Sequence, residues 1–157
     1  MPKFKKILVA LDGSKNSFRA LTKAIEIAKE TKASITSISV IQTYRTEMGV
    51  VKTIAGNALS KNCKIFINKA RTRCMKNNIS FFDFIQYGQE GKTIVTFAEK
   101  NNFDMIVIGS RGRGILTESF LGSTSNYVVH STKIPVLIVK WNNCQDVKIY
   151  NLILKFR

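Results

Sequence analysis

The sequence predicts a single α/β domain built around a mainly parallel sheet. Its 157 residues suit one hydrophobic core, and 45% of them are hydrophobic. Five short apolar runs alternate along the chain with stretches of helical period. The first run, Ile7 to Leu11, is continuously apolar, as expected for a strand covered on both faces. This alternation favours parallel strands joined by right-handed helical crossovers.

The expected elements follow the apolar pattern along the chain. Leu21, Ile25 and Ala28 are spaced as one face of a helix that starts after Ser14. Tyr44 to Gly49 is expected to be a polar connection. Strands are expected at residues 5–11, 34–41, 79–87, 103–108 and 134–139, and helices at about 15–29, 52–77, 92–101 and 127–130. A domain at 1–140 precedes an extension at 141–157, whose apolar run at 147–156 fits a strand slightly better than a short helix.

Composition excludes several classes of protein. The longest apolar runs are far shorter than the ~20 residues that span a bilayer, so no membrane segment is expected. Asp12 ends the first apolar run too early for a secretory signal. Cys63, Cys74 and Cys144 form no CxxC pair, so we expect buried thiols and a cytoplasmic location. The only histidine is His130, and no metal site made of protein ligands alone is expected.

The most informative stretch is glycine-rich and follows the fourth expected strand, from Gly109 to Thr124. Glycine lets a ligand approach the main chain closely. Amide groups at a helix start, beside the hydroxyls of Ser123 and Thr124, form an anion site. Arg111 and Arg113 could add charge-assisted contacts. The segment therefore predicts phosphate binding.

Two common phosphate motifs do not fit the sequence. Gly88-Gln-Glu-Gly91-Lys92-Thr93 has two residues between its glycines, whereas a Walker loop needs four. The segment at Gly109 reads GxxGxG rather than GxGxxG and does not follow the first strand, so a dinucleotide fold is not expected. It does match GxxG, nine residues, then G[ST], through Gly109, Gly112, Gly122 and Ser123.

Over residues 3–140 the chain resembles the universal stress protein family. The resemblance rests on segments in the family's order and spacing: KKILVALDGS (5–14), the strand ending Ser39-Val40, DMIVIGSRGRG (104–114), LGSTSNYVVHS (121–131) and PVLIVK (135–140). It implies a five-stranded parallel sheet flanked by helices, a Rossmann-like fold of the adenine nucleotide alpha hydrolase-like kind, usually dimeric. In one subgroup it implies bound ATP, or ADP or AMP, together with Mg²⁺.

The resemblance also implies roles for individual residues. Asp12 would meet the ribose hydroxyls or a metal, and Val40 would present backbone groups to adenine. Gly109 and Gly112 would hold the ribose and the first phosphates, while the segment 122–124 would donate to the outer phosphates. The candidate binding residues are Ala10, Leu11, Asp12, Val40, Ile108, Gly109, Arg111, Gly112, Gly122, Ser123 and Thr124.

Simpler interpretations of these residues stay open. Asp12-Gly13-Ser14 is also a turn and helix cap that needs no ligand. Ser123 and Thr124 could likewise only cap the last helix, and Arg113 could only be solvated. No nucleophile motif is present, so no catalytic residue is assigned and slow ATP hydrolysis is the most that the residues allow. The expected role is a nucleotide-binding module in stress response or signalling.

Charge suggests a rival function of another class. The chain has 25 Lys and Arg against 10 Asp and Glu, a net charge of +15. The expected helix at 52–77 carries seven basic residues and no acidic one. Such a surface could bind nucleic acid or another polyanion in a salt-dependent way and without sequence specificity. The alternative is a solvated helix, because no aromatic residue interleaves its basic face.

A homodimer is expected at the edge that carries Ile134 to Val139. The resemblance places this strand at the border of the sheet, and an apolar border strand pairs with another chain unless it is covered. The tail could cover its own edge or cross onto the partner. We favour the crossing, because Trp141 and the apolar run behind it would otherwise leave a large exposed patch.

Overall fold

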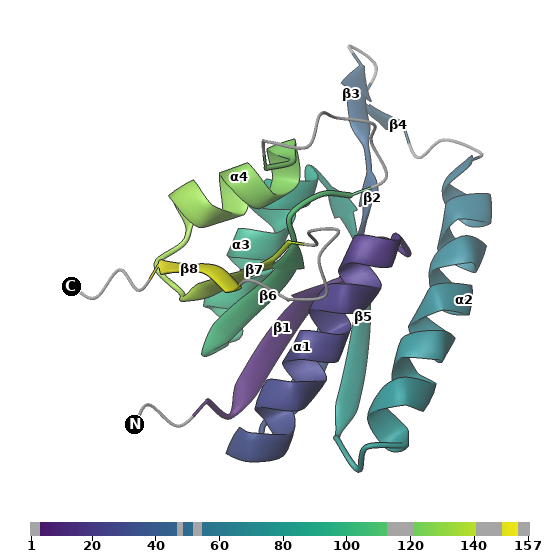
Figure 1. Cartoon of the computed structure of the whole chain (residues 1–157). Helices are drawn as coiled ribbons and strands as arrows, with labels where there is room; N and C mark the ends of the chain where they lie inside the picture. The colour runs from purple at the N-terminus through teal and green to yellow at the C-terminus, as the bar shows by residue number, and fades with distance from the viewer. Residues whose placement is uncertain (1–3, 47–48, 52–54, 113–120, 141–148, 154–157) are drawn as a thin grey trace.

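The computed structural model describes residues 4–46, 49–51, 55–112, 121–140 and 149–153 (Figure 1). In chain order the elements are β1 (Lys6–Ala10), α1 (Lys15–Thr31), β2 (Ser34–Gln42), β3 (Tyr44–Thr46), β4 (Gly49–Val51), α2 (Ala55–Met75), β5 (Phe81–Gly88), α3 (Glu90–Lys100), β6 (Met105–Gly109), α4 (Ser123–Ser131), β7 (Val136–Val139) and β8 (Ile149–Ile153).

Six strands form the main sheet, in the order β5-β2-β1-β6-β7-β8. The first five in that order run parallel to one another, which confirms the expected five-stranded parallel sheet. The chain moves outward from β1 to β2 and β5, and then crosses to β6 on the other side of β1. Strand order therefore reverses between β1 and β6, and this reversal is where parallel α/β sheets place their ligands.

Helices cover both faces of the sheet, with α1 and α2 on one face and α3 and α4 on the other (Figure 1). Side chains alternate between the two layers along β1. Ile7 and Val9 pack into the core with α1 and α2, whereas Leu8 packs into the core with α3 and α4. All three are fully buried, which explains why this strand is continuously apolar.

Helix α1 starts directly behind the turn that follows β1. The Ser14 hydroxyl accepts a hydrogen bond from the Ser17 N–H at 3.1 Å and so caps the first turn. Leu21, Ala24 and Ala28 then face the sheet, all buried. The helix ends at Lys32, whose φ of 57° lies in the left-handed region. The cap fixes the turn between β1 and α1 at the carboxyl edge of the sheet.

Two expectations about the elements need correction. The connection expected from Tyr44 to Gly49 contains an antiparallel hairpin, β3–β4, whose three-residue strands are too short to give a periodic signal. The last helical run begins earlier than expected, so that Ser123 and Thr124 belong to α4. Cys63 and Cys74 are buried, as expected, whereas Cys144 lies outside the described residues.

The tail contributes a strand, β8, which pairs antiparallel with β7 of the same chain. The strand agrees with the sequence analysis, but the tail covers its own edge, the option that was not favoured. Trp141 lies outside the described residues. A homodimer at this border stays a prediction, and it would have to pair β8 with its copy or exchange the two tails. None of the described helices has the length and hydropathy that crossing a membrane requires.

Ending the chain at Lys140 should uncover the outer edge of β7. We expect the shortened chain to self-associate more strongly than the full chain, because an unpaired apolar edge strand is a template for pairing. Light scattering coupled to size exclusion, at matched micromolar concentrations, gives both masses. A full-length dimer that becomes a monomer on truncation would instead show that the tails are exchanged between chains.

The buried thiol of Cys74 should make stability fall in alkaline solution. Burial raises the pKa of this thiol from 9.0 to about 11, so the unfolded chain loses the proton first. The stabilisation is complete below pH 9 and is lost as the pH rises from 9 to 11. Between pH 8 and pH 10 the unfolding free energy of the native chain should fall by about 1 kcal/mol more than that of Cys74→Ala. Urea unfolding at each pH measures the unfolding free energy of the native chain and of the variant. An equal fall with pH in the two proteins would contradict the assignment of the effect to Cys74.

Candidate functional site

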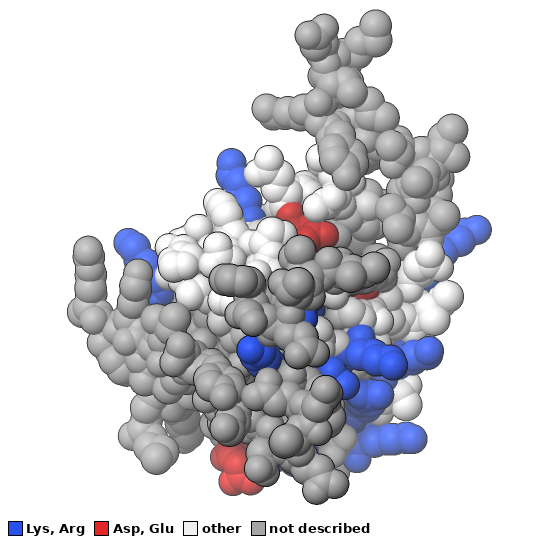
Figure 2. Space-filling model, turned by 45° about the horizontal axis from the view of Figure 1, so that its top comes forward, with Lys and Arg blue, Asp and Glu red and all other residues white. Residues whose placement is uncertain are grey.

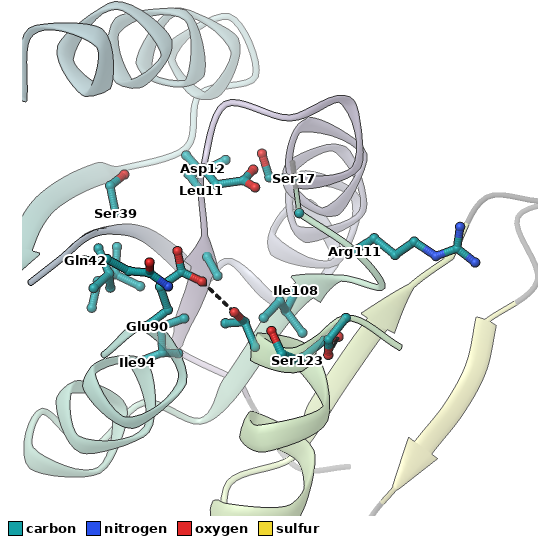
Figure 3. A pocket seen from close by; sticks show the side chains of 18 of the residues that line it. Leu11, Asp12, Ser17, Ser39, Gln42, Glu90, Ile94, Ile108, Arg111 and Ser123 are labelled. Atoms are coloured by element: carbon teal, nitrogen blue, oxygen red, sulfur yellow. Dashed lines mark hydrogen bonds between the residues drawn. The ribbon is translucent and has the colours of Figure 1, made fainter. Parts of the chain in front are cut away.

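A pocket of about 400 Å³ opens at the carboxyl ends of β1, β2 and β6, at the reversal of strand order. Its wall includes all eleven candidate residues predicted from the sequence: Ala10, Leu11, Asp12, Val40, Ile108, Gly109, Arg111, Gly112, Gly122, Ser123 and Thr124. Figure 3 shows Asp12 on one side of the cavity and Ser123 on the other. The structure brings these residues together, and their contact with a nucleotide stays a prediction.

Asp12 directly follows β1 and faces the glycine-rich segment. One carboxylate oxygen, Oδ1, accepts a hydrogen bond from the Ser14 N–H at 2.9 Å, in a turn that Gly13 completes with a φ of 82°. The other oxygen, Oδ2, lies only 2.8 Å from where a Cβ on Gly112 would stand. The residue that caps α1 is Ser14 and not Asp12, so helix capping does not explain why an aspartate stands at position 12.

Gly109 lets β6 end against the first turn of α1. A Cβ at this position would lie 3.0 Å from the backbone carbonyl carbon and oxygen of Asn16. Those atoms belong to a helix and cannot move aside cheaply, so any larger residue would separate the strand from the helix. The absence of a side chain keeps the floor of the pocket narrow between β1 and β6.

The start of α4 presents backbone donors to the pocket. Gly122 is the N-cap and no side chain caps the helix there, so the N–H groups of Ser123 and Thr124 have no intrahelical acceptor. The Ser110 carbonyl accepts hydrogen bonds from the Gly122 N–H at 2.8 Å and from the Ser125 hydroxyl at 3.0 Å. These two bonds tie the helix start to the end of β6.

Sequence analysis missed an acidic residue at the same end of the pocket. The Thr124 hydroxyl donates a hydrogen bond to Glu90 Oε2 at 2.6 Å, drawn as a dashed line in Figure 3. The hydroxyl of Thr124 is therefore engaged, and its backbone N–H is the donor left for an anion. Glu90 opens α3 just behind β5, and its place at the carboxyl end of a parallel strand was the available signal.

The inner part of the pocket is mainly apolar, with one buried hydroxyl that lacks a partner. Among the described residues, the hydroxyls of Ser37 and Ser39 make no hydrogen bond, and Ser39 is 1% exposed. Ser39 lines the pocket (Figure 3). Buried hydroxyls nearly always have a partner, so a group inside the pocket can supply it. The lining residues that sequence analysis did not assign to the site are Ser17, Ile38, Ser39, Ile41, Gln42, Cys63, Phe66, Glu90, Ile94 and Ser125.

Arg111 does not point its charge into the pocket. Figure 3 shows the Arg111 side chain extending away from the cavity, so a contact between its guanidinium and a phosphate would need another rotamer. Arg113 lies outside the described residues. Among the described residues, the backbone at the start of α4 supplies positive potential at this end.

The pocket also has carboxylates that suit a cation bound by phosphates. No group of three or more His, Cys, Asp or Glu that could hold a metal is found in the part of the chain that the structure describes. Mg²⁺ on a nucleotide needs only one or two carboxylates, since phosphates and waters complete its shell. Asp12 and Glu90 both line the pocket. The residues present therefore fit a nucleotide-bound Mg²⁺ but not an isolated metal site.

Comparison with known proteins supports the same fold and identifies the family. The family model for the universal stress proteins matches residues 3–140. The chain belongs to the universal stress protein family. Universal stress protein YxiE of Bacillus subtilis is 31% identical over 150 residues, which cover 87% of this chain and 99% of that relative.

Solved structures of the family superpose on the chain closely. The structure of MJ0577 from Methanocaldococcus jannaschii has a TM-score of 0.77 at 26% identity, and the match covers 90% of this chain and 99% of that one. A universal stress protein solved in complex with cAMP has a TM-score of 0.68 at 23% identity, covering 88% of this chain and 98% of that one. At that identity the second likeness shows the fold.

Adding a methyl group at two glycines of the pocket should have unequal effects on stability. Gly109→Ala forces backbone apart and should cost about 1–3 kcal/mol. Gly112→Ala has only the carboxylate end of Asp12 to displace, so its cost should stay within about 0.5 kcal/mol. Chemical unfolding of both variants measures the difference. Equal losses would mean that Asp12 is held as firmly as the helix backbone.

Proposed function

We propose that this universal stress protein binds an adenine nucleotide, with ATP as the first candidate, in the pocket between Asp12 and Ser123. The observation that carries the proposal is the pairing of two features at the reversal of strand order. A carboxylate stands at the end of β1, and an uncapped helix start stands opposite it behind glycines. The carboxylate can accept hydrogen bonds from hydroxyls, and the N–H groups at the helix start can donate to an anion. Together the two features suit a sugar phosphate.

Each part of the pocket has chemistry for one part of the ligand. The Asp12 carboxylate can accept hydrogen bonds from the ribose hydroxyls. The N–H groups of Ser123 and Thr124 can donate to phosphate oxygens with the favourable field of the helix N-terminus. Ile38, Ile94 and Ile108 offer apolar surface to the base. The Ser39 hydroxyl can then donate to or accept from a group on the ligand.

Because the carboxylates of Asp12 and Glu90 line the pocket, we expect the binding of a triphosphate to depend on Mg²⁺. Glu90 stands within hydrogen-bond distance of Thr124, at the end assigned to the phosphates. The negative charge of the Glu90 carboxylate is unfavourable beside the negative phosphates, and a bound Mg²⁺ offsets the charge of both groups. AMP carries less charge and should depend on Mg²⁺ less strongly.

The pocket is assigned a binding role rather than a catalytic one. Its described lining residues include no histidine or lysine, and the two carboxylates, Asp12 and Glu90, are assigned here to the ribose and to the cation on the phosphates. Any hydrolysis of ATP should therefore be slow. The solved relative in complex with cAMP supports an adenine nucleotide as the ligand class. We place this role in stress response or signalling in the cytoplasm, where the buried thiols of Cys63 and Cys74 would stay reduced.

Calorimetric titration with ATP, ADP, AMP and cAMP, each with and without Mg²⁺, tests the proposal. We expect saturable binding of at least one nucleotide, tighter with Mg²⁺ for ATP. Asp12→Asn keeps the shape of the side chain but removes its charge, and should weaken binding by about tenfold. Glu26→Gln removes the same charge from the exposed face of α1 and should leave affinity unchanged.

Two results would contradict the proposal. One is the absence of heat for every nucleotide at millimolar concentration. The other is an equal loss of affinity in Asp12→Asn and Glu26→Gln, which would trace the effect to overall charge rather than to the pocket. Gly112→Ala supplies an independent check, because it displaces the Asp12 carboxylate without removing it.

A further inference from the structure

A second hollow, of about 320 Å³, lies on the α1 and α2 side of the molecule and is lined mainly by polar and charged side chains. Its lining residues are Gly13, Lys15, Phe18, Arg19, Thr22 and Arg73. Three of these are cations, and none of the described lining residues is acidic. The hollow shares no lining residue with the nucleotide pocket. We call it the basic hollow.

Positive charge continues from the basic hollow along α2. Lys61, Lys64 and Lys69 are exposed on this helix, and Lys76 is exposed just beyond its end. Helix α2 contains no acidic residue at all. Figure 2 shows several Lys and Arg on the lower right of the molecule, the side on which α2 lies in Figure 1. Such a surface attracts polyanions.

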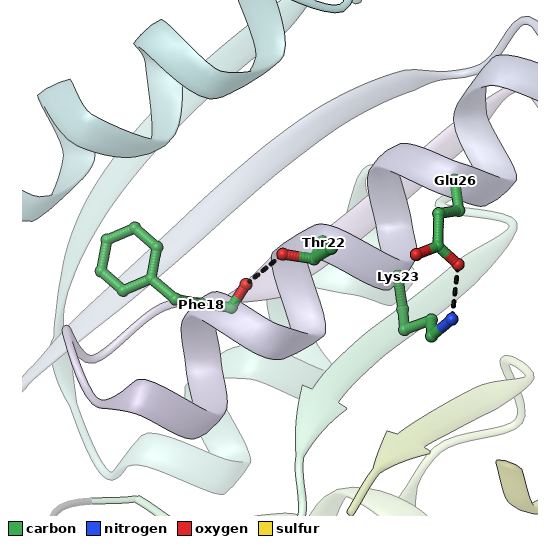
Figure 4. Close-up of polar contacts among 4 residues, drawn as sticks. All are labelled: Phe18, Thr22, Lys23 and Glu26. Carbon is green, nitrogen blue, oxygen red and sulfur yellow. Dashed lines mark hydrogen bonds and ion pairs between the residues drawn. The ribbon is translucent and has the colours of Figure 1, made fainter. Parts of the chain in front are cut away.

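Several polar groups in and beside the basic hollow already have partners within the chain. Lys23 pairs with Glu26 at 2.5 Å, and the Thr22 hydroxyl donates to the Phe18 carbonyl at 3.0 Å (Figure 4). On the side of β5, Arg71 pairs with Asp83. The compensated cations, Lys23 and Arg71, thus stand outside the basic hollow, while Lys15 and Arg73 line it.

An aromatic ring lies beneath one of the cations, which sequence analysis did not foresee. The Arg73 guanidinium carbon lies 4.8 Å from the centroid of the Phe18 ring. Phe18 is partly buried against the core, so the ring is a fixed platform for an exposed arginine. Arg19 is positioned as well, because its Nη1 donates to Asn16 Oδ1 at 2.9 Å. The aromatic partner of the basic helix α2 comes from α1.

We propose that the basic hollow binds single-stranded nucleic acid. Lys15 and Arg19 contact phosphates of the backbone, and the planar guanidinium of Arg73, held on Phe18, stacks on an unpaired base. A cationic groove with a stacking platform tolerates any sequence, because every base has a π-face. Single strands are favoured over a duplex because only an unpaired base can reach a platform between two helices.

Fluorescence anisotropy with labelled twelve-nucleotide RNA and DNA strands of mixed sequence, and with a duplex of the same length, tests the proposal on the full chain. With the two cations Lys15 and Arg19 on phosphates, single-strand affinity should fall by about sevenfold between 50 and 200 mM salt. Lys15→Gln with Arg73→Gln should reduce that fall to about threefold. Lys92→Gln with Lys100→Gln removes the same charge from α3 and should leave it unchanged.

A charge-conserving variant separates stacking from electrostatics. Arg73→Lys should lower affinity by about fivefold or more while keeping the salt dependence, because an ammonium cannot stack on a base. Saturating ATP should not displace the strand, since the two sites share no residue. Circular dichroism checks the fold of each variant, and Lys15→Gln alone serves if the double variant does not fold.

Four outcomes would overturn the proposal. They are no binding to any strand at 50 mM salt, equal effects of the two double variants, duplex binding as tight as single-strand binding, and displacement of the strand by ATP. Equally tight duplex binding would mean that the hollow binds the phosphate backbone of a duplex. Displacement by ATP would mean that the strand binds in the nucleotide pocket. Nucleotide binding is measured separately, so failure here leaves the proposed function untouched.

Discussion

The structure depends on the central position of β1, a parallel strand that pairs on both edges and is buried on both faces. Residues 7–9 are in register with residues 35–37 of β2 on one side and with 105–107 of β6 on the other. Because neighbouring strands and helices surround β1, the chain that follows it has to leave the sheet at the carboxyl edge. Because the chain goes to β2 first and reaches β6 later, the connections on its two sides diverge there. The pocket is the space that this divergence opens.

The pocket is shaped as much by missing side chains as by those present. Gly109 lets β6 approach the first turn of α1, and Gly112 leaves room for the Asp12 carboxylate. The Ser110 carbonyl then holds the start of α4 against the end of β6 through two hydrogen bonds. These contacts place a carboxylate and an uncapped helix start on opposite sides of one cavity. Backbone geometry thus supplies the anion site, which explains why the outward direction of Arg111 does not remove it.

One short turn separates two regions of opposite character. Asp12 faces the nucleotide pocket, whose described charged lining includes two carboxylates, whereas Gly13 and Lys15 face the basic hollow. Helix α1 borders both regions. The net charge of +15 is therefore unevenly distributed, with Lys23 and Arg71 in ion pairs and further cations gathered at the basic hollow and along α2. The basic hollow and the nucleotide pocket therefore lie on different sides of the start of α1.

The sequence by itself determined the five strands, the four helices between them and the glycine-rich segment after β6, through signals within a few residues, namely apolar period, capping groups and glycines at strand ends. Its resemblance to the universal stress protein family supplied the other residues of the pocket. Only the tertiary structure decided that Thr124 bonds to Glu90, that the Ser39 hydroxyl is buried without a partner, that Arg73 lies over Phe18 and that β8 covers β7. Each of these depends on residues from different elements. A local pattern states which face of an element is apolar, but the neighbour that meets that face is fixed only when the elements pack together.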